Sequence, residues 1–324
     1  MKIWKKWVGA LIPLSGLMLL PATAQEFPAR PIRIIVPFAP GGNVDITARI
    51  IAPGMGEILG QQVIVENRPG GGGMVATAQV VKGPADGYTL VLGSSSTISV
   101  APAVAKNPPY DPTRDLALLG PIQAVPIVLT ASAKSSIGSY REFVAQAQAR
   151  PGRLSVASAG TGTSNHLALE LLIRQTGLKL IHVPYKGSGP ALVDLLGGQV
   201  ETMLDQLTAS MAHIKEGRLR ALAVTTRKRS ALLPEVPSLA ELGLTDYDVS
   251  TFTGLVAAAG TPRPILDKLA AALARVLAQA AIRERFAALG VEMIESDART
   301  FDAYVKKDYE NWRTLARDAG ISLE

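Results

Sequence analysis

The chain has 324 residues, of which 48% are hydrophobic and 19% are charged, so it is long enough to bury a core and to form two domains. It contains no cysteine, which excludes disulfides, a thiol nucleophile and cysteine-ligated metal sites. Its formal net charge is +6, but the basic residues form neither a basic helix nor a basic stripe interleaved with aromatic residues. The sequence therefore does not indicate a nucleic-acid partner.

The N-terminal residues have the pattern of a secretory signal peptide. Three lysines precede an apolar run from Trp7 to Leu20, and Ala22-Thr23-Ala24 supplies small residues for cleavage. A membrane anchor is the alternative, but the apolar run is short for a bilayer span. We therefore predict that residues 1–24 are a cleaved signal peptide. The mature protein is then expected to be soluble in the periplasm, with a net charge of +3 (30 basic against 27 acidic residues).

The first stretch after the signal predicts a strand, a tight loop and a helix. Ile34-Ile35-Val36 suits a buried strand, Pro40-Gly41-Gly42-Asn43 is turn chemistry, and Asp45 stands where an N-cap would precede the apolar spacing of a helix. Such a unit places free backbone N–H groups and the positive end of a helix dipole at the carboxyl end of a strand. Ligands usually bind there in open α/β sheets, and an anion would be favoured.

Two further loops follow short predicted strands. The glycines Gly70 to Gly73 come after Val63 to Glu66, but no Gly-Lys-Ser/Thr ends this run, so it does not predict a nucleotide phosphate loop. The strand Tyr88 to Leu92 ends in a cluster of hydroxyls that includes Ser94, Ser95 and Thr97. These hydroxyls suit ligand donors in the same cleft or a plain serine-rich helix start, and both interpretations can hold.

The strand-loop-helix pattern returns in the second half of the chain. Leu154 to Ala157 leads into a loop from Ser158 to His166, and leucines after it mark a helix. Gly160 and Gly162 resemble the start of a dinucleotide fingerprint, but Asn165 stands where the third glycine belongs. We therefore expect no nicotinamide and no other cofactor, and the three histidines of the chain lack the spacing of metal ligands.

A hydrolase is an alternative, because Ser164, His166 and Asp205 have the residue types of a catalytic triad. Ser164 and His166 are two residues apart at a helix start, where their side chains point apart, and the chain has no Gly-x-Ser-x-Gly elbow. We therefore expect no catalytic residue. His166 is better interpreted as a hydrogen-bonding wall or a structural histidine.

Predicted strands alternate with helices as far as Leu219 to Val224, which indicates an α/β protein with a mostly parallel sheet in each half. From Pro262 to the end the apolar spacing is helical. We expect a domain boundary near the strand that runs from Pro121 to Thr130.

Six motifs in this order resemble the extracytoplasmic solute receptors of tripartite tricarboxylate transporters, the Bug-type periplasmic binding proteins. The resemblance covers essentially the whole mature chain. Any one motif alone is weak, whereas six in order behind a signal peptide are highly specific. They are Pro31-Ile32-Arg33 through Asp45, Val65-Glu66-Asn67-Arg68-Pro69-Gly70, Pro84-Ala85-Asp86-Gly87-Tyr88-Thr89-Leu90, Gly160 through Leu167, His182-Val183-Pro184-Tyr185-Lys186-Gly187, and Gly260-Thr261-Pro262.

The resemblance implies a two-domain, type II-like periplasmic binding fold with hinge strands that cross between the domains. Domain 1 would comprise residues 25–126 and 252–324, and domain 2 residues 127–251. A monomer of this kind closes on a small organic carboxylate and delivers it to membrane transporter subunits. A receptor that serves a sensor kinase is the alternative partner assignment.

The resemblance also nominates ligand-binding residues. In that family the first loop and the loop from Gly160 to His166 grip one carboxylate through backbone amides, hydroxyls and ordered waters. The residues carried over are Phe38, Gly42, Asn43 and Asp45 from the first domain, Gly160, Thr163, Ser164 and His166 from the second, and Ser94, Ser95, Thr97 and Asp205 for the remainder. These loops lack Lys and Arg, so an arginine clamp is not expected.

The chain departs from the family pattern at three places. Pro53-Gly54-Met55-Gly56 interrupts the first helix, which we expect to be kinked or short. Phe252-Thr253 stands where a tryptophan and another large residue are common, and this changes the far wall of the cleft. Ala258 stands where proline is usual.

Overall fold

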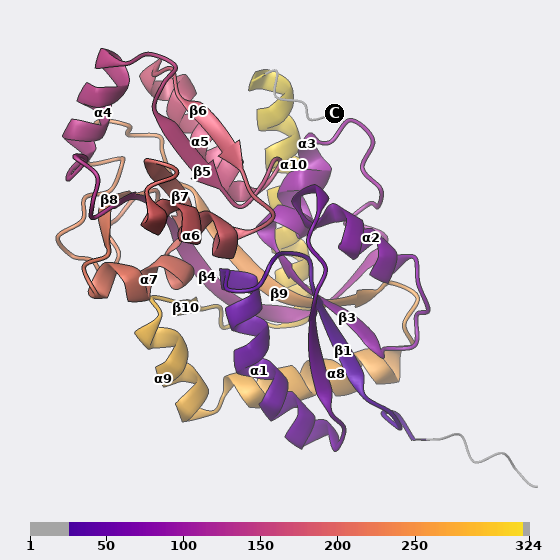
Figure 1. Ribbon diagram of the computed structural model, residues 1–324. Helices are drawn as coiled ribbons and strands as arrows, with labels where there is room; N and C mark the ends of the chain where they lie inside the picture. Colours follow the sequence, from indigo (N-terminus) through magenta and orange to yellow (C-terminus); the bar gives the residue numbers. More distant parts are fainter. Residues whose placement is uncertain (1–25, 320–324) are drawn as a thin grey trace, which may run out of the picture.

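The structure, a computed structural model, describes residues 26–319, so the predicted signal peptide lies outside the described residues. One continuous ten-stranded sheet runs through the described chain (Figure 1). In spatial order its main path is β2 (Val63–Asn67), β1 (Ile32–Val36), β3 (Thr89–Ser94), β9 (Ser250–Ala258), β4 (Leu116–Ser132), β7 (Thr202–Gln206), β5 (Ser155–Ser158) and β6 (Ile181–Pro184). Beside this path, β8 (Leu219–Val224) and β10 (Glu292–Met293) pair with β4.

Parallel strand pairs lie in the two outer parts of the sheet, and antiparallel pairs lie between them. β1 is parallel to β2 and β3, and β5 is parallel to β6 and β7, as strand-helix-strand units require. β9 and β4 are antiparallel to their neighbours. The α/β fold predicted from the sequence is confirmed, and the two antiparallel strands make the sheet mixed at its centre.

The 17-residue strand β4 joins the two halves of the sheet. It pairs with β9 up to Pro126 and with β7 from Ile127 onward. We call the half with β1, β2 and β3 the first lobe and the half with β5 to β8 the second lobe, and we propose these lobes as the two domains. The boundary predicted between residues 126 and 127 falls where β4 changes partners.

Helices cover both faces of the sheet (Figure 1). The two largest hydrophobic cores lie around α1 and α8 in the first lobe and around Phe143 and Tyr247 in the second. The helices are α1 (Asn43–Leu59), α2 (Met74–Val81), α3 (Ala101–Val104), α4 (Tyr140–Ala149), α5 (Ser164–Thr176), α6 (Ser188–Gly197), α7 (Leu207–Lys215), α8 (Arg263–Leu277), α9 (Ala280–Ala288) and α10 (Ala298–Ala319), with a 3₁₀ turn η1 (Gly71–Gly73) and a π-helical turn η2 (Ser96–Val100).

Of the two expectations for the Pro-Gly-Met-Gly segment, a kinked or a short helix α1, the second is wrong. Helix α1 runs for 17 residues with Pro53 in its interior. Ile50, Ile51 and Met55 are buried in this helix. Burial stabilises by about 1.5–3 kcal/mol per such side chain, which together exceeds the cost of about 3 kcal/mol for an interior proline. Gly54 lets α8 approach closely, because a Cβ there would lie 3.1 Å from Val276 Cγ2.

Among residues 26–319, no helix is long and apolar enough to cross a bilayer.

Candidate ligand-binding site

The first predicted loop leads directly into α1, which begins three residues earlier than predicted. Gly42, not Asp45, is the N-cap residue, and the first helical bond runs from the Ile46 N–H to the Gly42 carbonyl at 3.0 Å. Asp45 lies in the first turn, where its Oδ2 accepts from the Gly41 N–H at 3.0 Å. It therefore fixes the loop from inside the helix. The amides ahead of Ile46 lack an intrahelical acceptor and are placed to meet an anion.

Two further residues make contacts that hold Asp45 ionised. Arg49 lies 3.0 Å from its Oδ1, and the Asn67 side chain donates to the same oxygen at 2.9 Å. Burial alone would raise the pKa of Asp45, but hydrogen bonds from Arg49, the Gly41 amide and Asn67 lower the pKa overall. A carboxylate ligand placed directly against Asp45 would be repelled. Its role is to shape the loop, whose residue Phe38 also receives a bond from Asn67 at its carbonyl oxygen.

The second predicted loop leads into α5 with a side-chain cap. Thr163 is the N-cap, accepts from the His166 N–H at 3.4 Å and donates its hydroxyl to the Gly160 carbonyl at 2.6 Å. Gly160 has φ +136°, and a Cβ there would lie 2.8 Å from the Tyr185 carbonyl oxygen, so only glycine fits without strain. The Gly162 N–H donates to His166 Nδ1 at 3.2 Å. His166 is thus part of the cap of α5.

His166 stacks on His182 with ring centroids 4.0 Å apart and an interplanar angle of 13°. Its Nε2 faces Glu170 Oε1 at 3.3 Å, and His182 Nε2 lies 2.7 Å from Ser158 Oγ. Burial lowers the pKa of both rings, and the neighbouring His166 adds to the effect on His182, whose pKa falls to about 4. Both rings are therefore neutral at pH 7, which lets them stack.

Hydroxyls from the two lobes meet at the start of α5. Ser164 Oγ lies 2.8 Å from Ser95 Oγ and 3.1 Å from Ser96 Oγ, and the Ser164 N–H donates to Ser96 Oγ at 3.0 Å. Ser95 also donates to Thr251 Oγ1 on β9 at 2.9 Å. The structure thus brings the predicted residues Ser95 and Ser164 together, and it adds Thr251, which the sequence analysis missed.

Asp205 lies behind this site. It is fully buried, and both its oxygens have partners: Oδ1 accepts from Ser188 and Oδ2 from Ser210 at 2.7 Å. Burial raises the pKa of Asp205 to about 6, against the opposing effect of the two hydroxyls and the Gln206 amide. Ser188 in turn packs against Gly42, where a Cβ would lie 3.4 Å from Ser188 Cβ. Asp205 therefore holds the residue that contacts the first loop.

Comparison with known proteins assigns the family. Residues 47–321 match the model of the family described as "Tripartite tricarboxylate transporter family receptor". The chain belongs to this family. It is similar to protein BugT of Bordetella pertussis, with 37% identity over 98% of this chain and 97% of that protein. Its fold is that of the periplasmic binding protein BugD, with a TM-score of 0.88, 36% identity and coverage of 92% of this chain and 100% of BugD. MatC from Rhodopseudomonas palustris, solved with bound malate, is also similar, with a TM-score of 0.85, 33% identity and coverage of 89% and 99%.

The receptor does not assemble the three residues of the hydrolase alternative into a triad. Ser164 bonds to hydroxyls of the first lobe, and His166 Nδ1 is occupied by the Gly162 amide. Asp205 accepts from two serines. The Ser158–His182 pair has hydrogen-bond geometry, but Ser158 Oγ also accepts from the Gly160 N–H at 3.1 Å and so belongs to the loop that leads into α5. Within residues 26–319, no group of three or more His, Cys, Asp or Glu could hold a metal ion.

A pocket of about 310 Å³ opens between the lobes of the receptor. Phe38 and Gly160, both predicted site residues, lie on opposite sides of it, and Lys186 is the charged residue among those that line it. Its volume is at the lower end of the range for ligand pockets, roughly 300–1,000 Å³. The lobes also touch beside it, since the Ala39 N–H donates to the Lys186 carbonyl at 2.9 Å.

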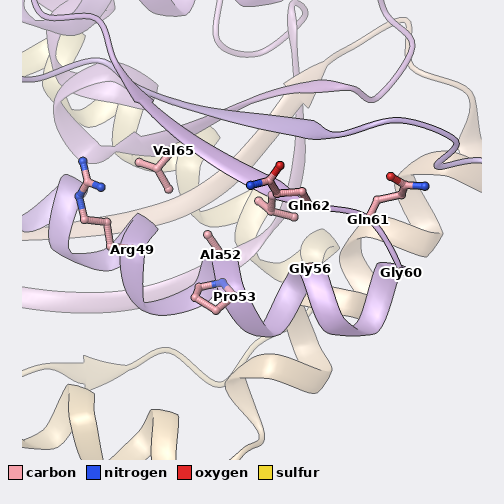
Figure 2. Close-up of a pocket in the computed structure, with 9 residues that line it drawn as sticks. Arg49, Ala52, Pro53, Gly56, Gly60, Gln61, Gln62 and Val65 are labelled. Atoms are coloured by element: carbon pink, nitrogen blue, oxygen red, sulfur yellow. The ribbon is translucent and has the colours of Figure 1, made fainter.

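A larger pocket of about 660 Å³ lies on the first lobe, between α1 and β2 (Figure 2). None of the predicted site residues lines it, so it is separate from the candidate site. The residues that line it are Arg49, Ala52, Pro53, Gly56, Gly60, Gln61, Gln62, Val63 and Val65.

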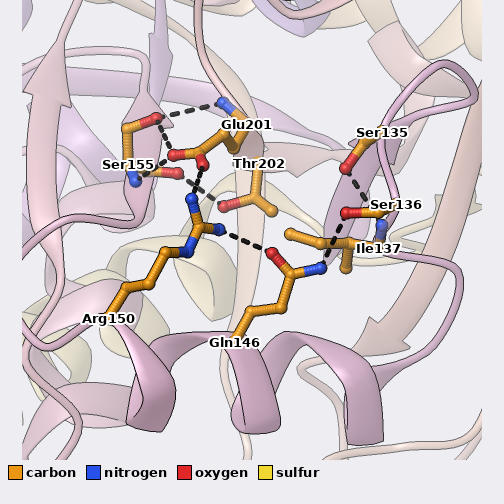
Figure 3. Close-up of polar contacts among 8 residues, drawn as sticks. All are labelled: Ser135, Ser136, Ile137, Gln146, Arg150, Ser155, Glu201 and Thr202. Carbon is orange, nitrogen blue, oxygen red and sulfur yellow. Dashed lines mark hydrogen bonds and ion pairs between the residues drawn. The ribbon is translucent and has the colours of Figure 1, made fainter.

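Arg150 and Glu201 of the second lobe form a charged network that lies away from the candidate site. Arg150 at the end of α4 lies 3.2 Å from Glu201 Oε1, and Glu201 accepts from the Ser155 amide at 2.9 Å (Figure 3). Gln146 extends this network to Ser136 with a bond of 2.8 Å. These contacts join α4 to the start of β5 and β7, at the end of the strands opposite to the candidate site.

Proposed function

We propose that this receptor binds a small organic carboxylate between its two lobes and delivers it to the membrane subunits of a tripartite tricarboxylate transporter. The observation that carries the proposal is the meeting of Ser95 with Ser164, because it brings the amide-rich start of α5 against the hydroxyls of the first lobe. Membership of the receptor family and the malate bound to its relative MatC support the same ligand class.

The carboxylate is held by dipoles and not by a cation. Between Phe38 and Ala48, Gly93 and Ala101, and Ser158 and Ala168, the sequence has no Lys or Arg. Backbone amides at the starts of α1 and α5 and the hydroxyls of Ser95 and Ser164 are the donors. A hydrogen bond to a charged group is worth about 1.5–3 kcal/mol, so two or three of them give useful affinity.

The same proposal includes the cellular setting. The receptor acts in the periplasm as a single chain after removal of residues 1–24, and it closes its lobes around the ligand. Closure requires that the ligand bind the closed form more tightly than the open form, and contacts from both lobes supply that difference. N-terminal sequencing of the exported protein tests the start at Gln25, and sedimentation velocity tests the single chain.

Native mass spectrometry of protein purified without denaturation tests the ligand. We expect a bound carboxylate to co-purify, and protein freed of it should bind the same acid in isothermal titration calorimetry. Loss of all binding for mono-, di- and tricarboxylates at millimolar concentration would contradict the proposal. Turnover of a carboxylate ester that disappears in Ser164→Ala would favour the hydrolase alternative instead.

A further inference from the structure

A group of buried polar side chains in the first lobe has no hydrogen-bonding partner. Among the described residues, seven buried side-chain nitrogen or oxygen atoms lack a partner, and four of them belong to residues that lie together. These four atoms are Asn43 Nδ2, Ser94 Oγ, Gln123 Oε1 and Thr253 Oγ1. Their residues are 0–2% exposed. We call them the Gln123 cluster.

Strand pairing places three members of the cluster side by side. Ser94 on β3 is opposite Thr253 on β9, and Thr253 is opposite Gln123 on β4. Residues directly opposite each other project their side chains from the same face of a sheet. Gln123 Nε2 donates to Asn43 Oδ1 at 2.6 Å and to Thr47 Oγ1 at 2.7 Å, so this is the face covered by α1. The cluster therefore lies at the start of α1, next to Ser95 and the candidate site.

The missing partners call for an explanation, because buried polar groups in folded proteins are nearly always hydrogen-bonded to protein, water or ligand. Thr251 provides a contrast on the same strand. It lies two residues before Thr253, so its side chain is on the same face, yet its hydroxyl accepts from Ser95 at 2.9 Å. The Thr253 hydroxyl therefore lacks a hydrogen-bonding partner because of its own position, and not because of β9 as a whole.

The donors and acceptors of the cluster indicate which group would complete it. Asn43 Nδ2 only donates, Gln123 Oε1 only accepts, and the hydroxyls of Ser94 and Thr253 do both. A carboxylate has no hydrogen to give to Gln123, and an ammonium has no lone pair for Asn43. A hydroxyl group both donates and accepts. The cluster has no charged member, so it also offers no counter-ion to a charged group.

We propose that the Gln123 cluster is a second subsite, which binds a hydroxyl group on the carbon chain of the carboxylate ligand. The inference rests on the proposed function and narrows it to hydroxy acids. When the lobes close, the ligand hydroxyl donates to Gln123 Oε1 and accepts from Asn43 Nδ2 and from the Thr253 hydroxyl, which are the three bonds that one hydroxyl can make. Thr253 is then a specificity-determining residue.

Calorimetric titration with matched pairs of acids tests the subsite. The pairs are lactate and propionate, malate and succinate, and 2-hydroxyglutarate and glutarate. For the pair that binds, we expect the parent protein to favour the hydroxy acid by about ten-fold or more, as one or two hydrogen bonds would give. Thr253→Val removes the hydroxyl but keeps the shape, and it should reduce this preference to less than about three-fold. Its melting temperature without ligand should stay equal to that of the parent or rise, because no bond inside the protein is lost.

Thr251→Val is the matched control, since the same change on the same face of β9 removes a hydroxyl that is bonded to Ser95. We expect it to lower the melting temperature and to weaken both acids of a pair equally, which leaves the preference unchanged. Equal binding of both acids in every pair by the parent, or an unchanged preference in Thr253→Val, would overturn the subsite and leave water as the partner of the cluster. That result would still be compatible with carboxylate binding, whereas binding of no carboxylate at all would overturn the proposed function as well.

Discussion

The Ser95 hydroxyl lies 2.8 Å from the Ser164 hydroxyl, although 69 positions separate the two residues in the sequence. Ser95 immediately precedes η2 in the first lobe, and Ser164 is the first residue of α5 in the second. The contact therefore exists only when the lobes are together. It places a hydroxyl from each lobe at the positive end of α5, where the helix dipole favours an anion.

Replacement of Ser164 by alanine should weaken carboxylate binding by about ten-fold to a hundred-fold, as expected for one lost charge-assisted hydrogen bond. The variant also loses the contacts with Ser95 and Ser96 that join the lobes. Calorimetry at low and high salt measures the effect. Salt should change the affinity of the parent little, because dipoles and not exposed charges hold the anion.

Ser136→Ala is the control for this variant. Its hydroxyl accepts from Gln146 in the outer network of the second lobe (Figure 3), so affinity should not change. Parent-like affinity in Ser164→Ala, or a steep salt dependence in the parent, would mean that the anion is held elsewhere. Lys186 on the interlobe pocket would then be the first residue to test.

Gly72→Ala should hinder closure of the lobes. Gly72 has φ +60°, and a Cβ there would lie 2.6 Å from the Thr161 carbonyl oxygen of the second lobe. The clash exists only in the closed form, so part of the binding free energy is used to overcome it. We therefore expect ligand affinity to fall by about ten-fold or more. Small-angle scattering should show a smaller decrease in radius of gyration at saturating ligand than in the parent.

Gly60→Ala separates the clash from backbone strain. Gly60 has φ +68°, and no atom lies within 4 Å of the position of its Cβ. It therefore carries a similar conformational cost of about 1 kcal/mol without a contact between the lobes. If both variants lose affinity equally, strain and not the Thr161 contact is responsible.

Local sequence signals predicted the elements that carry the site. The strand and turn residues around Ile34 and Leu154 lie next to each other in the chain, and the structure has β1 with α1 and β5 with α5 in these places. The spacing of Ser164 and His166 predicted that their side chains diverge. This is confirmed, since one faces Ser95 and the other stacks on His182.

Contacts between distant residues were beyond the reach of the sequence. Strand β9 was not recognised, because Gly254 and the two alanines at its end weaken the strand pattern and its place depends on pairing with β3 and β4. Thr251 meets Ser95 across 156 residues, and Gln123 meets Asn43 across 80. The start of α1 was misplaced for a different reason. Asp45 is a favoured N-cap residue, but Gly42 takes that position and Asp45 caps the loop from the first turn.

The stacked histidines should make the receptor less stable in acid. The unfolded chain protonates His182 near pH 6.5, whereas the folded protein protonates it only at about pH 4. Between these values the unfolded state binds more protons, so stability falls as the pH drops through this window. The lowered pKa of His166 acts in the same direction. His182→Gln removes one titrating ring and should show a smaller fall in melting temperature from pH 6.5 to 4.

Titration of Asp205 changes stability in the opposite direction, so its contribution must be distinguished from that of the histidines. Its pKa is raised from 3.8 to about 6 in the folded protein, so the folded state binds more protons and stability falls as the pH rises through that window. A comparison of parent and His182→Gln at each pH cancels this contribution. Curves that stay parallel from pH 7.5 to 4 would show that His182 does not titrate as described.

Asp308 on α10 should stabilise η2, the turn that follows Ser95 in the first lobe. Its Oδ2 accepts from Ser99 in η2 at 2.5 Å, and burial raises the pKa of Asp308, against hydrogen bonds from Ser99 and Trp312. Asp308→Ala removes the acceptor of both donors. We expect unfolding free energy to fall by about 1–2 kcal/mol, as for a partly buried hydrogen-bonded carboxylate. Ligand affinity should fall by roughly three- to five-fold, because η2 begins directly after Ser95 and its docking on α10 is loosened.

Asp302→Ala gives the matched control on the same helix. Asp302 is paired with Lys306 at 2.6 Å, and both side chains are more than 40% exposed. Exposed ion pairs contribute about 0.2–1 kcal/mol, so stability and affinity should stay close to those of the parent. Chemical denaturation measures the stability of the two variants, and calorimetry measures their ligand affinity. Together they show whether the effect comes from the Asp308–Ser99 bond or from any acidic side chain on α10. Equal losses in both would mean that any shortening of an acidic side chain on α10 disturbs the fold. A loss of stability without a loss of affinity in Asp308→Ala would show that the Ser99 contact holds the helix but does not position Ser95.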